Sequence, residues 1–285
     1  METPQEAPVV RLIGLRKSFG GVQVLRSIGL DLERGKTTVV MGPSGCGKSV
    51  MLKHIVGLLK PDEGEVWFDE TRIDGLSERA LIPHRLRMGL LFQMAALFDS
   101  MTVEENVAFP LIEHRRMTKA ERRDRVAEAL KRVDLDGTQH QLPAELSGGQ
   151  RKRVGLARAT VLEPALILYD EPTTGLDPIR ADGIDRLVCR FRDELGMTGL
   201  VVTHDLTSAQ KVGDRFIVLL DGEVAAQGSW DEVAAHDNPR VRRFLAGEYH
   251  ADDIGPAIRL NNEEARSEGQ PEAASPHGVG KEKGP

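Results

Sequence analysis

One short segment, residues 42–49, has the residue types and spacing needed to bind phosphate. It reads GPSGCGKS and fills the pattern G-x-x-x-x-G-K-[ST]. Glycines let backbone N–H groups point into a concavity, where the start of a following helix adds positive potential. The Lys48 ammonium would neutralise phosphate oxygens and the Ser49 hydroxyl would bind Mg²⁺, which favours a nucleotide site over an ordinary glycine-rich turn. The residues assigned to this phosphate loop are Gly42, Pro43, Ser44, Gly45, Cys46, Gly47, Lys48, Ser49 and Val50.

Two adjacent carboxylates follow a short apolar run farther along the chain. Residues 165–169 read ALILY and lead directly into Asp170 and Glu171. Sites in open α/β sheets form at the carboxyl ends of strands, and successive strand residues point to opposite faces. Asp170 can therefore support Mg²⁺ while Glu171 orients a water for attack on a γ-phosphate. An acidic turn after a buried strand is the alternative, and the presence of a phosphate loop disfavours it.

The elements that would position these residues alternate between strands and helices. Residues 9–32 are β-rich, a helix is expected at about 48–58, and residues 102–160 turn helical because Val126, Leu130 and Val133 recur at helical spacing. This order predicts an α/β fold in which helices cover a parallel sheet and residues 102–160 form an inserted helical lobe. Further strands are expected at residues 37–41, 65–69, 88–92, 165–169, 200–203 and 216–220.

Composition limits the classes of protein that the chain can belong to. Its 285 residues are 40% hydrophobic, which is enough to bury a substantial core. The net charge is −6, and residues 251–285 supply half of it with seven acidic and four basic side chains. The remaining part is nearly balanced, which argues against a nucleic-acid binder. Residues 251–285 hold few large apolar side chains, so we expect a disordered tail after a domain at residues 9–250.

Cysteine content and hydropathy indicate the compartment. Cys46 and Cys189 cannot build a disulfide framework, which favours a reducing environment. A redox role for Cys46 is conceivable, but a bystander residue is favoured because the middle positions of a phosphate loop tolerate many residue types. No apolar run approaches the roughly 20 residues that span a bilayer, and the first ten residues lack the features of a secretory leader. Any membrane role is therefore expected to be peripheral.

A third motif, LSGGQ at residues 146–150, narrows the class. Ser147 would cap a helix whose free N–H groups suit a phosphate, and the two glycines would allow close approach. With the phosphate loop and the acidic strand about 20 residues later, the sequence resembles the ABC ATPases. The resemblance implies a nucleotide-binding domain with a RecA-like mixed/parallel sheet core, an antiparallel β subdomain and an inserted helical subdomain. It also implies ATP and Mg²⁺ as cofactors.

The same resemblance gives roles to residues that are uninformative singly. Phe19 resembles the aromatic residue that stacks on adenine, and Gln93 resembles the glutamine that links the metal to a transmembrane partner. Asp177 lies in a GLD segment that resembles the loop crossing between subunits, and His204 resembles the histidine that contacts the γ-phosphate. Phe19 replaces the commoner tyrosine, which preserves stacking but removes a hydroxyl, so we expect weak discrimination between purine bases.

The family also implies how two chains share their sites. The LSGGQ motif of one chain completes the nucleotide site of a second copy, in a head-to-tail dimer that closes around two ATP molecules. Under the resemblance, Glu171, His204 and Lys48 are catalytic and Ser49, Gln93 and Asp170 hold the metal. The residues that would act on the partner's nucleotide are Ser147, Gly148, Gly149 and Gln150.

A narrower resemblance lies outside the nucleotide motifs. Residues 45–58, 92–110 and 168–179 are similar to the Mla-type phospholipid-transport ATPases, whereas Gln150 stands where that subfamily often has methionine. The resemblance implies an integral-membrane permease, an MCE-domain lipid-binding protein and a possible STAS-domain subunit as partners. It places the chain peripherally at the cytoplasmic face of the inner membrane.

Three other functions compete with this interpretation. A soluble ABC ATPase acting on DNA or the ribosome is disfavoured, because the chain has one cassette and Ser147 follows Gly42 by 105 residues, without room for a long coiled coil. A purely regulatory nucleotide binder is disfavoured because Glu171 and His204 are both present. An ABC importer or exporter for another solute has the same ATPase subunit, so this alternative stays open. The sequence also leaves the cargo and the direction of transport open.

Overall fold

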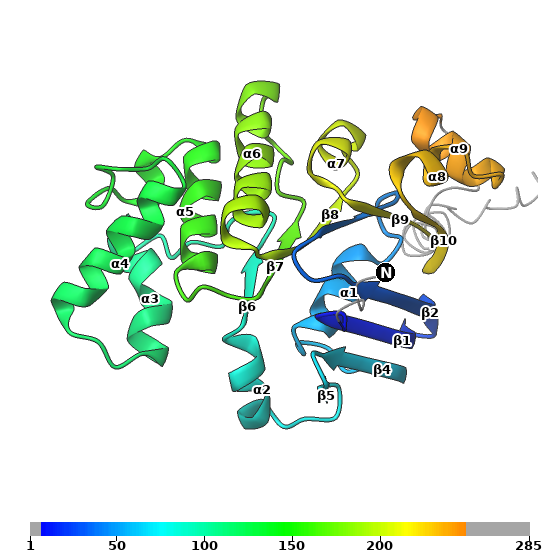
Figure 1. The fold of residues 1–285 in the computed structure, drawn as a ribbon, viewed down its shortest axis with the longest axis horizontal. Coiled ribbons are helices and arrows are strands. Elements are labelled where there is room, and N and C mark those ends of the chain that lie inside the picture. The colour runs from blue at the N-terminus through cyan, green and yellow to red at the C-terminus, as the bar shows by residue number, and fades with distance from the viewer. Residues whose placement is uncertain (1–6, 249–285) are drawn as a thin grey trace, which may run out of the picture.

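The computed structural model describes residues 7–248, so the predicted tail at residues 251–285 lies outside the described residues. Ten strands in this part of the chain form two sheets (Figure 1). A four-stranded antiparallel sheet has the order β2-β1-β4-β5, and a six-stranded sheet has the order β10-β9-β3-β8-β7-β6. The strands are β1 (Val10–Phe19), β2 (Val22–Leu32), β3 (Thr37–Met41), β4 (Glu63–Phe68), β5 (Thr71–Arg72), β6 (Met88–Leu91), β7 (Leu166–Asp170), β8 (Thr198–Thr203), β9 (Arg215–Leu220) and β10 (Glu223–Gly228).

Nine α-helices of the described residues surround these sheets. Figure 1 shows α6 and α7 above the six-stranded sheet, with α1 below it next to the antiparallel strands. The helices are α1 (Lys48–Ile55), α2 (Glu78–Arg85), α3 (Val103–His114), α4 (Lys119–Arg132), α5 (Gly148–Thr160), α6 (Pro178–Leu195), α7 (Leu206–Val212), α8 (Trp230–Ala234) and α9 (Pro239–Ala246), and a short 3₁₀ helix η1 spans Pro143–Glu145. Within residues 7–248, no helix combines the length and apolar character that a membrane crossing needs.

The central strands of the six-stranded sheet are buried on both faces. Strands β6, β7, β8, β3 and β9 run parallel, and only β10 pairs antiparallel with its neighbour. Side chains alternate along β3, so Val39 and Met41 join one core cluster and Val40 joins the other. Strand β7 was visible in the sequence because a parallel strand buried on both faces reads as a continuous apolar run, and β3 was visible as a short β-branched run.

The two core clusters correspond to the two layers that cover the sheet. One cluster packs α5, α6 and α7 against the sheet through residues such as Leu156, Leu187 and Ala209. The other joins α1 to the antiparallel sheet through residues such as Met51 and Leu15. The predicted α/β class, with a mixed sheet, an antiparallel β part and a helical part, is confirmed.

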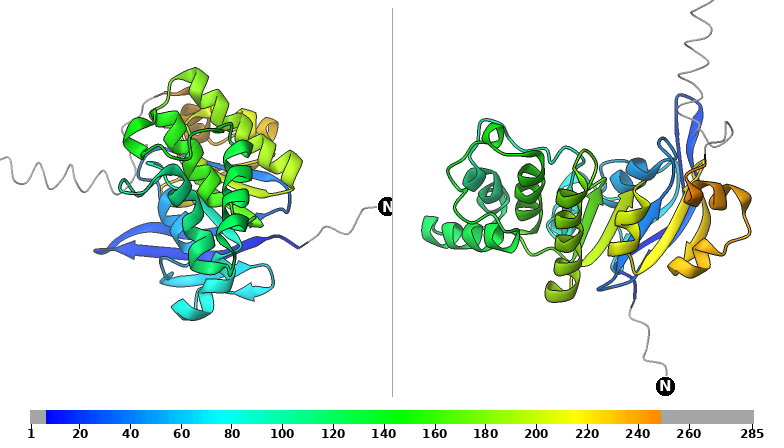
Figure 2. Two further views of the ribbon diagram at one scale, coloured as in Figure 1. Left: turned by 90° about the vertical axis from the view of Figure 1, so that its left-hand side faces the viewer. Right: turned by 90° about the horizontal axis from the view of Figure 1, so that it is seen from above.

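The helical lobe consists of α3, α4 and α5, which Figures 1 and 2 show gathered at one end of the molecule. Each of these helices begins with a capping box, in which Thr102, Thr118 and Ser147 accept a hydrogen bond from the backbone N–H three residues later. In α4, Val126 and Leu130 are buried as their helical spacing predicted. The three helices lie within residues 103–160.

Candidate functional site

The phosphate loop joins the buried end of β3 to α1, and two glycines make that path possible. A Cβ atom on Gly42 would lie 2.2 Å from the carbonyl oxygen of Leu219 in the neighbouring strand. Gly47, just before α1, has φ of 105° and leaves no room for a side chain beside Leu25. Glycine is therefore required by sterics at Gly42 and Gly47, and these two positions let the backbone turn into the N-terminus of α1.

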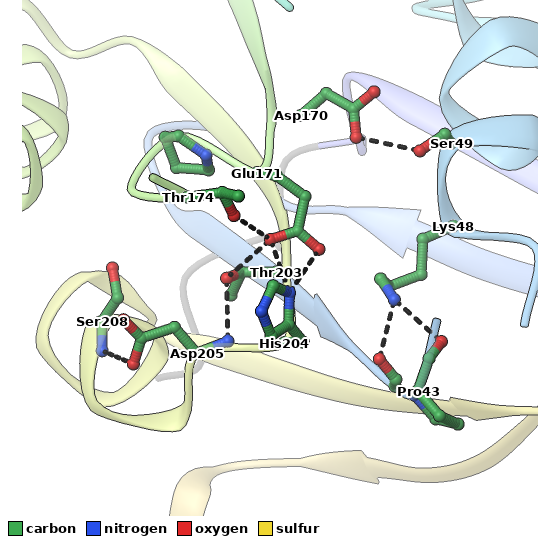
Figure 3. A network of polar contacts seen from close by, with 12 residues as sticks. Pro43, Lys48, Ser49, Asp170, Glu171, Thr174, Thr203, His204, Asp205 and Ser208 are labelled. Atoms are coloured by element: carbon green, nitrogen blue, oxygen red, sulfur yellow. Dashed lines mark hydrogen bonds and ion pairs between the residues drawn. The ribbon is translucent and has the colours of Figure 1, made fainter. Parts of the chain in front are cut away.

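The lysine of the motif is held against its own loop. Lys48 Nζ donates hydrogen bonds to the carbonyl oxygens of Gly42 (2.7 Å) and Pro43 (3.0 Å), as Figure 3 shows. Cys46 Sγ lies 3.9 Å from the same nitrogen, with the cysteine 1% exposed. Burial raises the pKa of Cys46, which keeps it a thiol, so the bystander interpretation of Cys46 is the favoured one.

The carboxyl end of β7 brings an acidic residue to the start of α1. Ser49 Oγ donates to Asp170 Oδ1 at 3.0 Å across the sheet edge (Figure 3). Burial raises the pKa of Asp170, and the hydrogen bond from Ser49 opposes that shift. A hydroxyl next to a carboxylate is the hard oxygen donor set that suits Mg²⁺, and the pair leaves room for phosphate oxygens and waters as further ligands.

The next residue, Glu171, points away from Asp170 and is held on several sides. Its carboxylate accepts a hydrogen bond from Thr174 Oγ1 at 3.0 Å and lies 3.4 Å from Thr203 Oγ1. The ring nitrogen His204 Nδ1 lies 3.0 Å from Glu171 Oε1 (Figure 3). The side chain of Glu171 is 12% exposed, so the carboxylate is fixed in orientation while one face stays open to water. This geometry suits a group that orients an attacking water.

Two cations on α5 that were not identified from the sequence donate to backbone carbonyls, and of these the buried Lys152 does so at this site. Lys152 Nζ donates to the carbonyl oxygens of Glu171 (3.1 Å) and Pro172 (2.6 Å). Burial lowers the pKa of Lys152 to about 8, an effect that the nearby charge of Glu171 opposes. Arg158 donates to the carbonyl oxygens of Ala95 and Ala96, both at 2.8 Å. Neither contact leaves a sequence signal, because the partners are 19 and 63 residues away along the chain.

The LSGGQ motif lies at the start of α5, apart from the phosphate loop of its own chain. Figure 1 shows α5 beside α6 and the helical lobe, whereas α1 lies on the other side of the sheet. Ser147 caps α5 as predicted, and Gln150 Oε1 accepts from the Ser147 backbone N–H at 2.9 Å. A Cβ atom on Gly149 would contact Arg180 at the start of α6. The structure therefore brings the motif next to the Asp177 loop.

The remaining predicted residues lie at the periphery of the site. Phe19 ends β1, is 44% exposed and has Lys17 Nζ 5.6 Å from its ring centroid. Gln93 is exposed and follows β6 at the same sheet edge as Asp170. Asp177 caps α6 by accepting from the backbone N–H groups of Ile179 and Arg180. Phe19, Gln93 and Asp177 are each accessible to a ligand, and Asp177 also stabilises the start of α6.

Comparison with known families and proteins agrees with this geometry. The family model described as ABC transporter matches residues 25–174. The chain is 40% identical over 263 residues to the intermembrane phospholipid transport system ATP-binding protein MlaF of Escherichia coli K12, which covers 87% of this chain and 98% of that protein. It is 41% identical over 265 residues to the probable ribonucleotide transport ATP-binding protein mkl of Mycobacterium leprae, which covers 93% of this chain and 75% of that protein.

Solved structures show the same cassette. A dimeric ATP-binding cassette in a post-hydrolysis state with ADP and phosphate matches with a TM-score of 0.72 and 38% identity, over 77% of this chain and 98% of that one. The phosphate loop, the acidic strand end, the LSGGQ helix and these matches lead to one assignment. The chain belongs to the ABC transporter family and is an ATP-binding subunit that hydrolyses ATP to drive transport.

Proposed function

We propose that this protein powers the movement of phospholipid between membranes. The support is the similarity to MlaF, whose whole length is matched almost completely, at 98%. The mycobacterial relative is named for ribonucleotide transport and is matched over 75% of its length. The narrower resemblance lies in residues 92–110, which include Phe92, Phe98 and Phe109 in the lining of an apolar surface groove, and it favours the same cargo class.

The hydrolytic step follows from the paired placement of Asp170 and Glu171, which is the observation that carries the mechanism. Lys48 and the N–H groups of residues 42–49 bind the β- and γ-phosphates of ATP, and Glu171 accepts a hydrogen bond from the attacking water. His204 Nδ1, 3.0 Å from Glu171 Oε1, positions that carboxylate, and the His204 ring would contact the γ-phosphate of bound ATP. Mg²⁺, held by Ser49 and Asp170 with Gln93 nearby, would neutralise charge on the phosphate oxygens.

A second copy of the chain completes each site in this proposal. The LSGGQ motif lies away from the phosphate loop of its own chain, at the start of α5, where Ser147, Gly148 and Gln150 are partly exposed. Free N–H groups and a helix dipole at that position suit a γ-phosphate presented by another subunit. The dimeric cassettes among the solved relatives support this arrangement. ATP binding then closes the dimer, and hydrolysis opens it.

An apolar groove along the edge strand β6, called the partner groove, is the proposed contact with the permease. Its volume is about 510 Å³, and it lies between α2, β6 and α3. Phe98 inside it is 42% exposed, and Met94, which follows β6, is 85% exposed. Exposed aromatic side chains in a groove are typical of a protein interface. The apolar residues lining it include Ile82, Leu86, Phe92, Phe98, Phe109 and Leu162.

The full assembly in this proposal lies at the cytoplasmic face of the inner membrane. It contains the permease, an MCE-domain lipid-binding protein and a possible STAS-domain subunit, and the ATPase is bound peripherally. Affinity purification of the tagged chain from detergent-solubilised membranes tests this composition. Recovery of a permease, an MCE-domain protein and bound phospholipid would support the proposal, whereas recovery of a permease with nucleotide cargo would favour the function named for the mycobacterial relative.

A further inference from the structure

The backbone at Glu171 adopts a conformation that ordinary residues avoid. Its φ is 51°, in the left-handed region, although glutamate has a Cβ atom that crowds the backbone there. The backbone N–H of Glu171 donates to the carbonyl oxygen of Val202 at 2.9 Å, which ties the turn to β8 on one side. A strained residue persists only where its surroundings over-determine it, and such residues cluster at functional sites.

Lys152 supplies the contact on the other side of this turn. Its Nζ donates to the carbonyl oxygen of Glu171 itself and to that of the next residue, Pro172. Lys152 is 6% exposed, and burial depresses its pKa, so placing an ammonium group there costs free energy. A residue whose only task was to attach α5 to the core could be apolar. The two carbonyl contacts explain why a cation is present instead.

The position of Lys152 on α5 connects this contact to the LSGGQ motif. Ser147 caps the helix, Gln150 lies in its first turn, and Lys152 follows within the next turn. Backbone hydrogen bonds make this stretch rigid, so a displacement of the helix start also displaces the Lys152 ammonium. In the proposed dimer the helix start contacts the nucleotide of the partner, while Glu171 acts on the nucleotide of its own chain.

We propose that Lys152 is a positioning residue that sets the orientation of Glu171 and couples it to the LSGGQ contact of the same chain. This inference rests on the proposed dimer and on the proposed role of Glu171. When the start of α5 contacts the nucleotide bound by the partner, the position of Glu171 at the nucleotide of its own chain is thereby adjusted. Lys152 touches neither ATP nor the attacking water, so its effect belongs to the turnover step and not to nucleotide affinity.

A neighbouring arginine provides a matched control. Arg153, on the same helix, donates to the carbonyl oxygen of Val133 and to Asp134 Oδ2 at 2.7 and 2.8 Å. It fastens α5 to the end of α4 through a carbonyl contact of the same kind but contacts other residues than the Glu171 turn. Loss of Arg153 therefore measures the cost of loosening α5 without changing the contacts of Glu171.

The experiment compares Lys152→Met, Lys152→Gln, Lys152→Arg and Arg153→Gln in the full chain with MgATP. Lys152→Met should lower kcat by about ten- to a hundredfold while the KM for ATP stays within about twofold, because misplacement affects the reacting geometry alone. Lys152→Arg should recover most of kcat, since it retains donors for both carbonyls. Arg153→Gln should lower Tm but keep kcat within about twofold. Lys152→Gln serves as the folded variant if Lys152→Met is insoluble.

Several results would overturn the inference. They are unchanged kcat in Lys152→Met or Lys152→Gln, a rise in KM that accounts for the whole loss, failure of Lys152→Arg to recover turnover, or an equal kcat loss in Arg153→Gln. Glu171→Gln, measured alongside, separates the two levels of argument. If Glu171→Gln retains turnover, the proposed role of Glu171 fails; if it is inactive while Lys152→Met is fully active, only the role of Lys152 fails.

Discussion

Glu171 is the single residue whose substitution best tests the proposed mechanism of ATP hydrolysis. Its carboxylate is oriented by Thr174, Thr203 and His204, and no other glutamate or aspartate in the described part of the chain is held by these three side chains. A fixed carboxylate can accept a hydrogen bond from water without reorganising, which is the main source of catalytic advantage at such a site. The Asp170 carboxylate instead accepts a hydrogen bond from Ser49, and its proposed role is to support Mg²⁺.

Glu171→Gln should leave ATP binding intact and reduce turnover by about 10²-fold or more, because a neutral amide oxygen is a far weaker base and acceptor for the attacking water than a carboxylate. The variant should accumulate as an ATP-bound dimer, detectable by size-exclusion chromatography with light scattering. Turnover within a few-fold of the wild-type rate would remove Glu171 from the role assigned to it.

At the scale of single elements, Asp134 joins two helices. Its carboxylate accepts hydrogen bonds from Arg153 on α5 (2.8 Å) and Arg190 on α6 (3.1 Å). Burial opposes its ionisation, but the bonds and charges of the two arginines outweigh that effect and lower the pKa of Asp134. A carboxylate with a lowered pKa stabilises the fold above its unfolded-state pKa, and this contribution is lost as the pH falls through the folded-state pKa.

Asp134→Asn should therefore reduce the free energy of unfolding at pH 7 by about 1 kcal/mol, the upper range for partly exposed ion pairs. Asparagine tolerates the positive φ of 56° at this position, so the change isolates the charge. The difference in unfolding free energy from the wild type, measured by urea denaturation at pH 7 and again at about pH 3, should shrink at the lower pH. An equal difference at both pH values would contradict the ion-pair explanation.

The partner groove offers another element-scale test. Phe98 is 42% exposed and packs on Phe109 with ring centroids 5.0 Å apart, whereas Leu97 packs against the main core cluster. Phe98→Ser should weaken co-purification of the permease and leave basal ATPase activity within about twofold, since an exposed contact is removed far from the phosphates. Leu97→Ala is the control, with a lower Tm expected from the core contact that it loses.

If Phe98→Ser lowered Tm and basal ATPase activity as strongly as Leu97→Ala, the groove would be part of the helical packing and not a docking surface. Retained permease binding in a stable Phe98→Ser variant would also remove this residue from the interface.

The elements that the sequence predicted best are those with a single strong signal. Strand β3 was predicted at its observed bounds of Thr37–Met41, because it is a short β-branched run that ends in a glycine loop. The helix expected at residues 48–58 ends at Ile55, since Gly57 takes a positive φ of 70° that stops it. Helix α2 was missed, because it is short, polar and contains Pro83.

The residues of the candidate site were likewise predictable only where they belong to a sequence motif. Lys48, Ser49 and Asp170 were identifiable because each belongs to a motif whose spacing fixes its geometry. Lys152 was not, because its contact with Glu171 depends on how α5 packs against the turn after β7. Long-range side-chain contacts of this kind follow from tertiary packing and leave no local pattern.

At the scale of the whole molecule, the separation of the two phosphate-binding features is the central observation. The phosphate loop leads into α1, whereas the LSGGQ motif begins α5 in the helical lobe (Figure 1). Ile179 is 85% exposed, and the residue after it, Arg180, lies against Gly149 of the motif. An apolar side chain so exposed next to the motif is consistent with a surface that a second copy covers.

Mixing two inactive variants tests this account most directly. Lys48→Ala removes the charge that binds phosphate, and Ser147→Arg blocks the LSGGQ contact, so each homodimer should be nearly inactive in an ATPase assay. A mixed dimer contains one composite site in which an intact Lys48 faces an intact Ser147, so an equimolar mixture should recover a clear part of the wild-type turnover. Absence of recovery in proven mixed dimers, or full activity of Ser147→Arg alone, would contradict the shared-site account.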